Sequence, residues 1–358
     1  MQTNMRVNLG KNSYDIIISV GAIDRLGEHV KQAYSGRKIF VLTDAHVAPL
    51  YLERTEKVLQ AAGYQTASLV LPAGESTKCL EKLAEVYNAL HAFGATRSDA
   101  LLALGGGVIG DLGGFAAATY MRGIPFMQVP TSLLAQVDSS VGGKVAVNLP
   151  VGKNLVGNFY QPKLVVIDPD TLRTLSDRQF RDGMGEVIKY AAIRDAELFD
   201  LLEANTDREA LMENIVEIIR RSLDIKRGMV ENDERDTGER MLLNFGHTIG
   251  HSIEAAQNFS DYTHGEAVAA GMCLITELSE NAGMTKPGTF VRLRALIEAN
   301  NLPTNCSADL WPAMKSAVTV DKKHAGKKLT VVLVDKIGSS LLHATDNEFL
   351  TGTEALLR

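Results

Sequence analysis

Three features are scarce in this sequence of 358 residues, namely cysteine, long apolar runs and an excess of basic charge. The three cysteines, Cys79, Cys273 and Cys306, are isolated and form no CxxC pair, so we expect a reducing compartment and no cysteine metal ligands. No apolar run reaches the roughly 18 residues of a membrane-spanning helix, so no membrane partner is expected. The net charge of −6 gives no reason to expect nucleic acid. The first residues lack the basic and apolar segments of a signal peptide, and the cytoplasm is the expected compartment.

The chain also lacks internal repeats and low-complexity segments, and its bulk composition is ordinary. Hydrophobic residues make up 45% and charged residues 22%, which indicates a folded protein. A chain of this length favours two domains. Basic residues stand out near glycines and histidines, as small anionic substrates require.

Short β-branched runs alternate with helical patterns through the first half of the chain. The expected strands lie at 16–19, 38–43, 67–71, 100–104, 126–129 and 164–168, and the expected helices at 48–62, 76–93 and 108–121. This alternation predicts βαβ units on a mainly parallel sheet. The fold class is therefore α/β, with a Rossmann-like parallel-sheet domain over residues 1–175.

Long helical patterns dominate the second half. They lie at 178–194, 196–204, 207–232, 239–258, 263–282 and 287–300, and one short strand follows at 329–334. In the 207–232 segment, apolar residues recur on one stripe, which is typical of a helix that packs against a core. We therefore predict a mostly α-helical C-terminal domain over residues 176–358.

A glycine loop, Gly105–Asp111, follows one expected strand and opens a helix. Its GxGxxG spacing lets backbone N–H groups approach a pyrophosphate at a helix N-terminus. Asp44 ends an earlier strand, where a partner for a ribose hydroxyl often lies. The loop follows a later strand and not the first, so it is not the ordinary dinucleotide motif. A tight strand–helix turn without a ligand is the alternative.

Two further polar segments lie near expected strands. The segment 72–78 follows a strand's C-terminal end, where α/β sheets bind ligands, although a capped helix start is the plainer interpretation. The segment 129–162 is rich in glycine, serine and lysine, and Gly142-Gly143-Lys144 suits an oxyanion. A Walker-type loop is excluded because its spacing is absent. A solvated basic loop is the alternative.

Three of the eight histidines lie between residues 240 and 266. His247 and His251 are four apart, so a helix places both on one face at metal-ligand spacing, and His264 could be a third ligand. On one continuous helix Arg240 and Asn244 share that stripe, and such a polar face is costly to bury, which argues against two core histidines. The remaining histidines are expected at the surface: His29, His46, His91, His324 and His343.

Glu186 and Lys189 are three residues apart on an expected helix. The plain interpretation of this pair is a surface ion pair between side chains on the same helix face.

Taken together, these motifs resemble the 3-dehydroquinate synthase family. The matching segments are Gly105–Asp111, Pro130–Lys144, Gly152–Asn154, Gly185–Tyr190, Asn244–His251, His264–Glu266 and Asp321–Lys323. They occur in the family's order over nearly the whole chain. The resemblance implies a shikimate-pathway cyclase that converts 3-deoxy-D-arabino-heptulosonate 7-phosphate to 3-dehydroquinate and phosphate. The implied reaction uses NAD transiently, with hydroxyl oxidation, phosphate β-elimination, reduction, ring opening and aldol closure.

The resemblance also implies cofactors and residue roles. The metal, zinc or cobalt, is expected on Glu186, His247 and His264, with His251 moved to the substrate or phosphate. The catalytic and substrate-contacting residues would be Arg122, Asp138, Lys144, Asn154, Lys189, Lys226, Arg240, Asn244 and His251, with either Lys322 or Lys323. NAD would lie along Asp44, Glu75, Lys78, Gly106, Gly107, Val108, Ile109, Gly110, Asp111, Thr131, Ser132, Lys144, Lys153, Thr171, Leu172, Arg173 and Thr174. A small anionic sugar phosphate is the expected substrate and a homodimer the expected assembly.

Three other functions compete with this interpretation. Another sugar-phosphate cyclase, which makes an inosose or a valiolone, would share the glycine loop and the metal set. A metal-dependent polyol dehydrogenase would release NADH as a net product. A non-enzymatic nucleotide-binding regulator would have lost its metal ligands, whereas Glu186, His247 and His264 are intact here.

Overall fold

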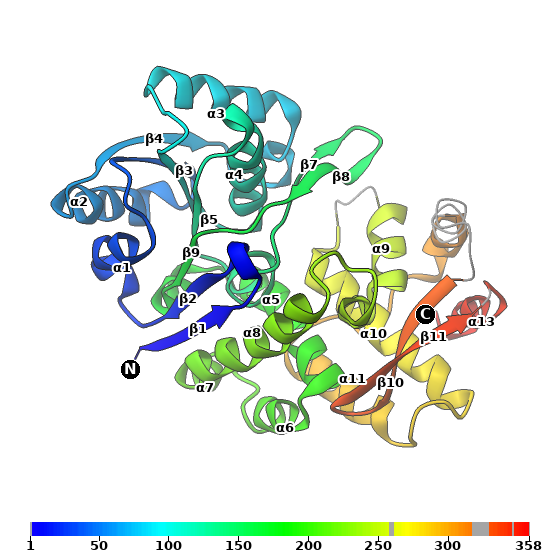
Figure 1. Cartoon of the computed structure of the whole chain (residues 1–358). Coiled ribbons are helices and arrows are strands. Elements are labelled where there is room, and N and C mark those ends of the chain that lie inside the picture. Colours follow the sequence, from blue (N-terminus) through cyan, green and yellow to red (C-terminus); the bar gives the residue numbers. More distant parts are fainter. Residues whose placement is uncertain (1, 258–260, 317–328, 346, 358) are drawn as a thin grey trace. The chain divides into compact units, whose positions relative to one another are not determined.

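A seven-stranded sheet organises the first part of the computed structural model, which describes residues 2–257, 261–316, 329–345 and 347–357 (Figure 1). The chain divides into two compact units, Met1–Ser176 and Asp177–Arg358. The sheet order is β1-β2-β9-β6-β5-β3-β4, and only the β1–β2 pair is antiparallel. Its strands are β1 (Thr3–Val7), β2 (Tyr14–Ile18), β3 (Lys38–Asp44), β4 (Gln65–Leu71), β5 (Ala100–Gly105), β6 (Phe126–Pro130) and β9 (Leu164–Ile167). The predicted parallel sheet is confirmed.

Helices cover both faces of this sheet, because its central strands β9, β6, β5 and β3 are buried on both faces. Alternate residues of β3 enter different cores: Ile39 and Val41 pack with one helix pair, and Phe40 and Leu42 with the other. The first core includes helices α1 (Leu26–Ala33) and α2 (Glu53–Ala61), and the second includes α3 (Leu80–Ala92) and α4 (Gly107–Thr119). Short helical turns lie at η1 (Gly10–Asn12), η2 (Ala22–Arg25), η3 (Ala48–Leu52), η4 (Glu75–Thr77), η5 (Tyr120–Arg122), η6 (Ala135–Ser139) and η7 (Pro169–Thr174).

A separate antiparallel hairpin, β7 (Lys144–Leu149) and β8 (Gly152–Phe159), occupies the segment expected to be a polar loop. The buried side chains of Val145 and Val147 in β7 join the core around α3 and α4. Strand β8 is largely exposed, and its many polar residues hid the strand pattern in the sequence.

The second unit is mostly helical, as predicted (Figure 1). Among the helices in the described part of this unit, α5 and α10 contain the largest numbers of buried residues. The helices are α5 (Asp177–Arg194), α6 (Ala196–Ala204), α7 (Arg208–Glu213), α8 (Ile215–Asn232), α9 (His247–Ala256), α10 (His264–Asn281), α11 (Thr289–Ala299) and α13 (Asn347–Thr351). The described part of this unit also contains a hairpin, β10 (Leu329–Lys336) and β11 (Ser339–Thr345), and the turns η8 (Glu239–Asn244), η9 (Ala308–Leu310) and η10 (Gly352–Leu356). No helix in the described ranges is long and apolar enough to cross a membrane.

Two expected helices are interrupted in the structure. The 207–232 segment breaks at Asn214, which ends α7 and caps α8. The 239–258 segment is a 3₁₀ turn up to Asn244, after which Phe245 and Gly246 leave the helical conformation and α9 begins at His247. The prediction of one helical stripe through Arg240, Asn244, His247 and His251 is therefore wrong. The physical reason is Gly246, whose φ of +77° is left-handed.

The expectation that the scattered histidines are exposed is wrong for His29. This residue of α1 is only 2% exposed, whereas His46 and His91 are exposed and His343 is half-buried. His324 lies outside the described residues.

Candidate metal centre and nucleotide-binding loops

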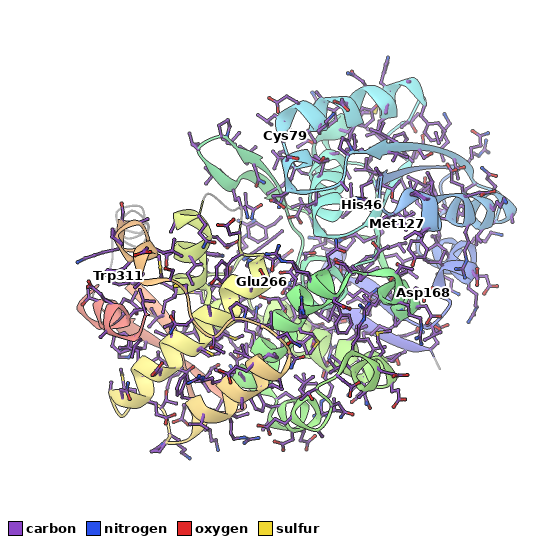
Figure 2. The ribbon with its side chains drawn as sticks, turned by 180° about the vertical axis from the view of Figure 1, so that it is seen from behind. His46, Cys79, Met127, Asp168, Glu266 and Trp311 are labelled. Carbon is purple, nitrogen blue, oxygen red and sulfur yellow. The ribbon has the colours of Figure 1, made fainter. Side chains whose placement is uncertain are left out.

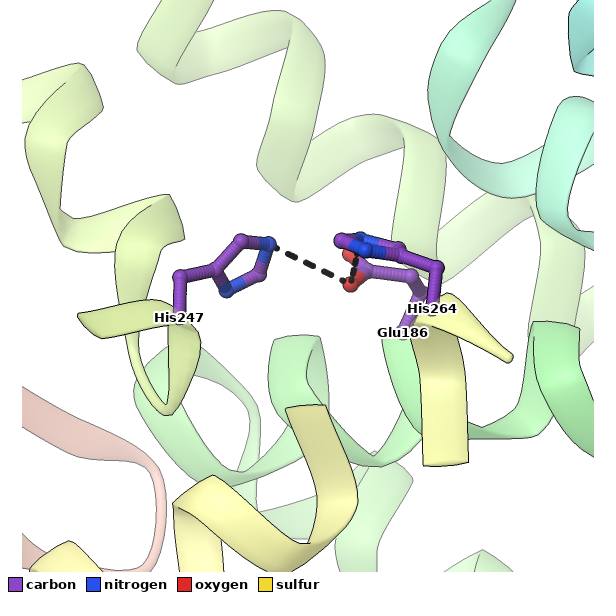
Figure 3. Close-up of side chains that lie close together, drawn as sticks. All are labelled: Glu186, His247 and His264. Atoms are coloured by element: carbon purple, nitrogen blue, oxygen red, sulfur yellow. Dashed lines mark ion pairs between the residues drawn. The ribbon is translucent and has the colours of Figure 1, made fainter. Parts of the chain in front are cut away.

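Glu186, His247 and His264 bring one carboxylate and two imidazoles together in the second unit (Figure 3). The Oε1 atom of Glu186 lies 3.6 Å from Nε2 of His247 and 3.6 Å from Nε2 of His264. One ligand atom from each residue lies within 4.8 Å of the other two. A donor set of one oxygen and two nitrogens suits a divalent transition metal and leaves coordination positions open.

Close backbone contacts between helices bring these three residues together. A Cβ atom at Gly185 would lie 2.7 Å from the Gly265 carbonyl oxygen, so glycine lets the start of α10 pack directly on α5. Glu186 directly follows Gly185 and His264 directly precedes Gly265, so this backbone contact places the two side chains next to each other. A Cβ at Gly271 would lie 2.1 Å from the carbonyl oxygen of Gly246, which brings the start of α9 against α10 in the same way.

Lys189 pairs with the carboxylate of Glu186 inside the second unit. Its Nζ atom donates to Oε2 of Glu186, and the two side chains are 2% and 1% exposed. The expected surface ion pair is therefore a buried one, because α5 is enclosed over the whole stretch from Gly183 to Ile193. A buried pair of this kind is retained for specificity or function more readily than for stability.

The two imidazoles have opposite charge preferences. Burial, with the nearby Lys189 ammonium, lowers the pKa of His247 to about 3, so this ring is neutral at pH 7. Its Nδ1 lies 3.0 Å from the carbonyl oxygen of Phe245, which leaves Nε2 as the metal-binding atom. Burial lowers the pKa of His264, but the carboxylates of Glu186 and Glu254 outweigh burial and raise it to about 10. A metal ion would displace that proton.

His251 lies beside this centre but groups with Glu254 and His264 and not with Glu186. Its ring centroid is 5.2 Å from that of His247 and 6.0 Å from that of His264. A second group of possible ligands in the described residues joins His251, Glu254 and His264, and it shares His264 with the first. The set His247, His251 and His264, which spacing alone suggested, does not form such a group among the described residues. The set that the resemblance implied does.

The glycine loop in the first unit has the predicted strand–turn–helix geometry. Strand β5 ends at Gly105, Gly106 is the N-cap of α4 without a side-chain capping bond, and the helix begins at Gly107. A Cβ at Gly106 would lie 3.3 Å from Oγ of Ser132, and one at Gly107 would lie 3.0 Å from Oγ of Ser139. The backbone N–H groups that open α4 can therefore meet an anion at close range.

A polar network surrounds Lys78, which is only 5% exposed. Its Nζ donates to Oδ2 of Asp111 in α4 and, at 2.5 Å, to Oδ1 of Asn154 in β8. Asn148 extends the network, since its Nδ2 donates to Glu75 at 2.7 Å and its Oδ1 accepts the N–H of Asn154 at 2.9 Å. The 72–78 segment is thus not simply a capped helix start, because Cys79, the N-cap of α3, makes no side-chain capping bond.

The other residues predicted to bind NAD follow the carboxyl ends of parallel strands, where α/β sheets bind ligands. Asp44 ends β3 and accepts the N–H groups of His46 and Val47. Thr131 and Ser132 follow β6, and 171–174 lie in η7, whose N-cap Asp168 directly follows β9 (Figure 2). The fully buried Gln136 connects the last two loops, because its Nε2 donates to Pro130, Asp168 and Thr171.

The remaining predicted residues occupy varied environments. In the second unit Lys226 and Arg240 are buried, and Arg240 donates to the carbonyl oxygen of Glu234 at 2.7 Å. Asn244 is exposed at the end of η8. In the first unit Arg122 and Lys144 are exposed and Asp138 and Lys153 are half-buried. Lys322 and Lys323 lie outside the described residues.

Sequence analysis missed three residues that the structure places at these sites: Glu254, Asn148 and Gln136. Glu254 had a usable signal, because it follows His251 by three residues and His247 by seven, on one helix face. Asn148 and Gln136 act across loops that are distant in sequence, and no local pattern marks them.

Comparison with known proteins places these features in a family. The profile described as 3-dehydroquinate synthase N-terminal matches residues 68–182, and the profile described as 3-dehydroquinate synthase C-terminal matches residues 183–324. The 3-dehydroquinate synthase of Clostridium beijerinckii is 51% identical over 345 residues, which cover 96% of this chain and 99% of the relative.

Solved structures of sugar-phosphate cyclases share the fold. The 2-epi-5-epi-valiolone synthase of Streptomyces hygroscopicus, with NAD+ and Zn2+ bound, has a TM-score of 0.87 at 30% identity and covers 98% of each chain. A 2-deoxy-scyllo-inosose synthase complexed with carbaglucose-6-phosphate, NAD+ and Co2+ has a TM-score of 0.89 at 22% identity, covering 99% of this chain and 100% of that one. The fold is that of the sugar-phosphate cyclases. Within that class, the chain belongs to the 3-dehydroquinate synthase family, and it is accordingly an enzyme, a lyase.

Proposed function

We propose that this protein converts 3-deoxy-D-arabino-heptulosonate 7-phosphate to 3-dehydroquinate and phosphate. The observation with most weight is the group of Glu186, His247 and His264, in which the buried carboxylate of Glu186 also pairs with the ammonium of Lys189. The 51% identity to a 3-dehydroquinate synthase supports this substrate over those of the inosose and valiolone synthases, which are 22% and 30% identical. The overall reaction would be hydroxyl oxidation, phosphate elimination, reduction, ring opening and aldol closure.

The second unit, residues 177–358, is proposed to bind the metal and most of the substrate. Glu186, His247 and His264 would hold zinc or cobalt, which when bound supplies a Lewis acid to a substrate hydroxyl. Lys189, Lys226 and Arg240 would supply cations to the substrate's phosphate and carboxylate, and their burial strengthens each charge–charge attraction. His251 and Asn244 would contribute hydrogen bonds to the substrate.

The first unit, residues 1–176, is proposed to bind NAD, which when bound accepts and returns a hydride. The N-terminus of α4 would receive the pyrophosphate, because Gly106 and Gly107 let the backbone approach. Asp44, Glu75, Lys78 and Asp111 would contact the ribose and adenine side. Asn154, Lys144, Asp138 and Arg122 are the residues of this unit that we propose as substrate contacts. By the family resemblance we also expect a homodimer that works in the cytoplasm, which sedimentation and cell fractionation would check.

The function is tested by following phosphate and NADH together. Purified protein with Co²⁺, NAD and the heptulosonate phosphate should release one phosphate per substrate without net growth of NADH absorbance, because the hydride returns to the substrate. A polyol dehydrogenase would instead accumulate NADH in proportion to turnover. Turnover of glucose 6-phosphate or sedoheptulose 7-phosphate in preference to the heptulosonate phosphate would contradict the proposed substrate.

Replacement of Lys78 by methionine should weaken NAD binding about 10-fold, the loss expected of one buried charge-assisted hydrogen bond of roughly 1.5 kcal/mol. Methionine fills a similar volume but no longer holds Asp111 and Asn154. Titration of cofactor fluorescence would measure the change. Lys82→Met is the matched control, because Lys82 in α3 pairs with the neighbouring Glu85 of the same helix and is more exposed than Lys78. Equal NAD affinity in both variants would count against the Lys78 network as a nucleotide site.

A further inference from the structure

Glu254 places a buried carboxylate directly behind one of the three proposed metal ligands. It lies in α9 and is only 5% exposed. Its Oε2 atom is 3.5 Å from Nδ1 of His264, whose other nitrogen, Nε2, lies 3.6 Å from Glu186. The imidazole of His264 therefore lies between two carboxylates, one on each ring nitrogen.

The two histidines of the centre share one arrangement. His247 has the Phe245 carbonyl oxygen 3.0 Å from Nδ1, and its Nε2 faces Oε1 of Glu186. His264 has the carboxylate of Glu254 at the corresponding place, and its Nε2 faces the same Oε1. An acceptor behind Nδ1 holds the proton there and leaves the lone pair of Nε2 toward the metal.

The acceptor for Nδ1 is a backbone carbonyl oxygen in His247 but a side-chain carboxylate in His264, and the position of His264 in its helix explains the difference. His264 is the first residue of α10, and Thr263 and Glu266 form the capping box that begins this helix. The carbonyl oxygen of Thr263 accepts the N–H of Ala267 at 3.0 Å, as the first turn of the helix requires. The backbone around His264 is thus committed to starting the helix, and the acceptor for Nδ1 comes from α9.

We propose that Glu254 is a positioning residue of the metal centre, which fixes the tautomer and orientation of His264 and so raises the affinity for the metal. This proposal rests on the metal site of the proposed function. A buried carboxylate is costly without a partner, and His264 is the partner that the geometry gives it. The competing role is direct ligation, because Glu254 also groups with His251 and His264 within 4.8 Å.

The test is Co²⁺ titration of the metal-free protein against a competing chelator, for the full chain and two variants. Glu254→Gln keeps the shape of the side chain and removes its charge, and it should weaken Co²⁺ binding 10- to 100-fold, the range for lost outer-shell partners. Its absorption bands at saturating Co²⁺ should match those of the unchanged protein, because the ligands are the same. Glu266→Gln is the matched control: it removes one charge from the same helix start, where Glu266 pairs with Arg178.

Each outcome has one interpretation. The proposal is supported if the unchanged protein and Glu266→Gln both bind Co²⁺ more tightly than Glu254→Gln does. The absorption bands at saturating Co²⁺ must then be the same in all three proteins. Equal affinity in all three proteins, or an equal loss in both variants, overturns it. Shifted bands in Glu254→Gln also overturn it, because Glu254 would then be a ligand. If Glu254→Gln does not fold, Glu254→Asp, whose carboxylate falls short of Nδ1, must show the affinity loss. Failure of the unchanged protein to bind Co²⁺ would instead refute the metal site of the proposed function.

Discussion

Alanine in place of Lys189 should abolish turnover while the protein keeps its full complement of metal. The Nζ atom of Lys189 pairs with Oε2 of Glu186, whereas the two imidazoles face Oε1 of the same carboxylate. The ammonium therefore contacts the centre without being a ligand. Its removal deprives the substrate's anionic groups of a buried cation. We expect kcat/KM to fall by about 10²- to 10³-fold, as when other preorganised groups are removed from enclosed sites.

Metal content should not fall in this variant, because the ammonium and the metal neutralise the same carboxylate. Breaking a buried ion pair costs about 3–5 kcal/mol when the remaining charge stays unpaired. In the loaded protein the divalent ion compensates Glu186, so the metal should raise the melting temperature of Lys189→Ala more than that of the unchanged protein. Metal analysis, phosphate release and thermal unfolding with and without Co²⁺ measure the three quantities.

Lys189→Met separates the charge from the volume of the side chain. It fills the space of the lysine stem beside Tyr190 and should behave like alanine in turnover, with a smaller loss of stability. Metal loss in both variants would mean that Lys189 maintains the ligand geometry and is not a substrate contact.

The alternating pattern of the first unit predicted six of the seven strands of its sheet, because strands buried on both faces are continuous apolar runs and glycine and polar residues mark their ends. It missed the edge strand β1, in which exposed positions alternate with half-buried ones. The hairpin β7–β8 escaped prediction for the opposite reason: only Val145, Ala146 and Val147 are buried in it, and its other positions are half-buried or exposed. The pattern of apolar residues along a sequence indicates which side chains are buried. This hairpin has few buried side chains, so its strands leave little pattern in the sequence.

The metal centre shows a different limit. Helical periodicity paired His247 with His251, since both lie in α9. The partner that spacing missed is Glu186, about sixty residues upstream, and it meets His264 only because Gly185 and Gly265 allow α5 and α10 to touch through their backbones. Such a contact depends on tertiary packing, and no periodic pattern in the sequence reveals it. The family resemblance supplied the set that spacing could not.

Replacement of His247 by alanine should remove the metal and turnover together. Metal binding by protein sites amounts to about 10–16 kcal/mol, so one ligand among three or four contributes roughly 3–4 kcal/mol, or on the order of 10³-fold in affinity. Co²⁺ titration and phosphate release measure both losses. The fold should persist, because Gly246 is the N-cap of α9 and the buried Ile249 and Ile253 anchor the helix.

His251→Ala is the matched control for His247→Ala, because the two histidines lie in one helix and their ring centroids are 5.2 Å apart. If Glu186, His247 and His264 hold the metal, the His251 variant keeps it and loses turnover alone, through lost contact with substrate. If the group of His251, Glu254 and His264 holds it, the pattern reverses: the His247 variant retains tight Co²⁺ binding and the His251 variant does not. Two proteins that differ only in which imidazole is missing therefore decide between the two ligand sets, since both sets contain His264 and no experiment on that residue can separate them.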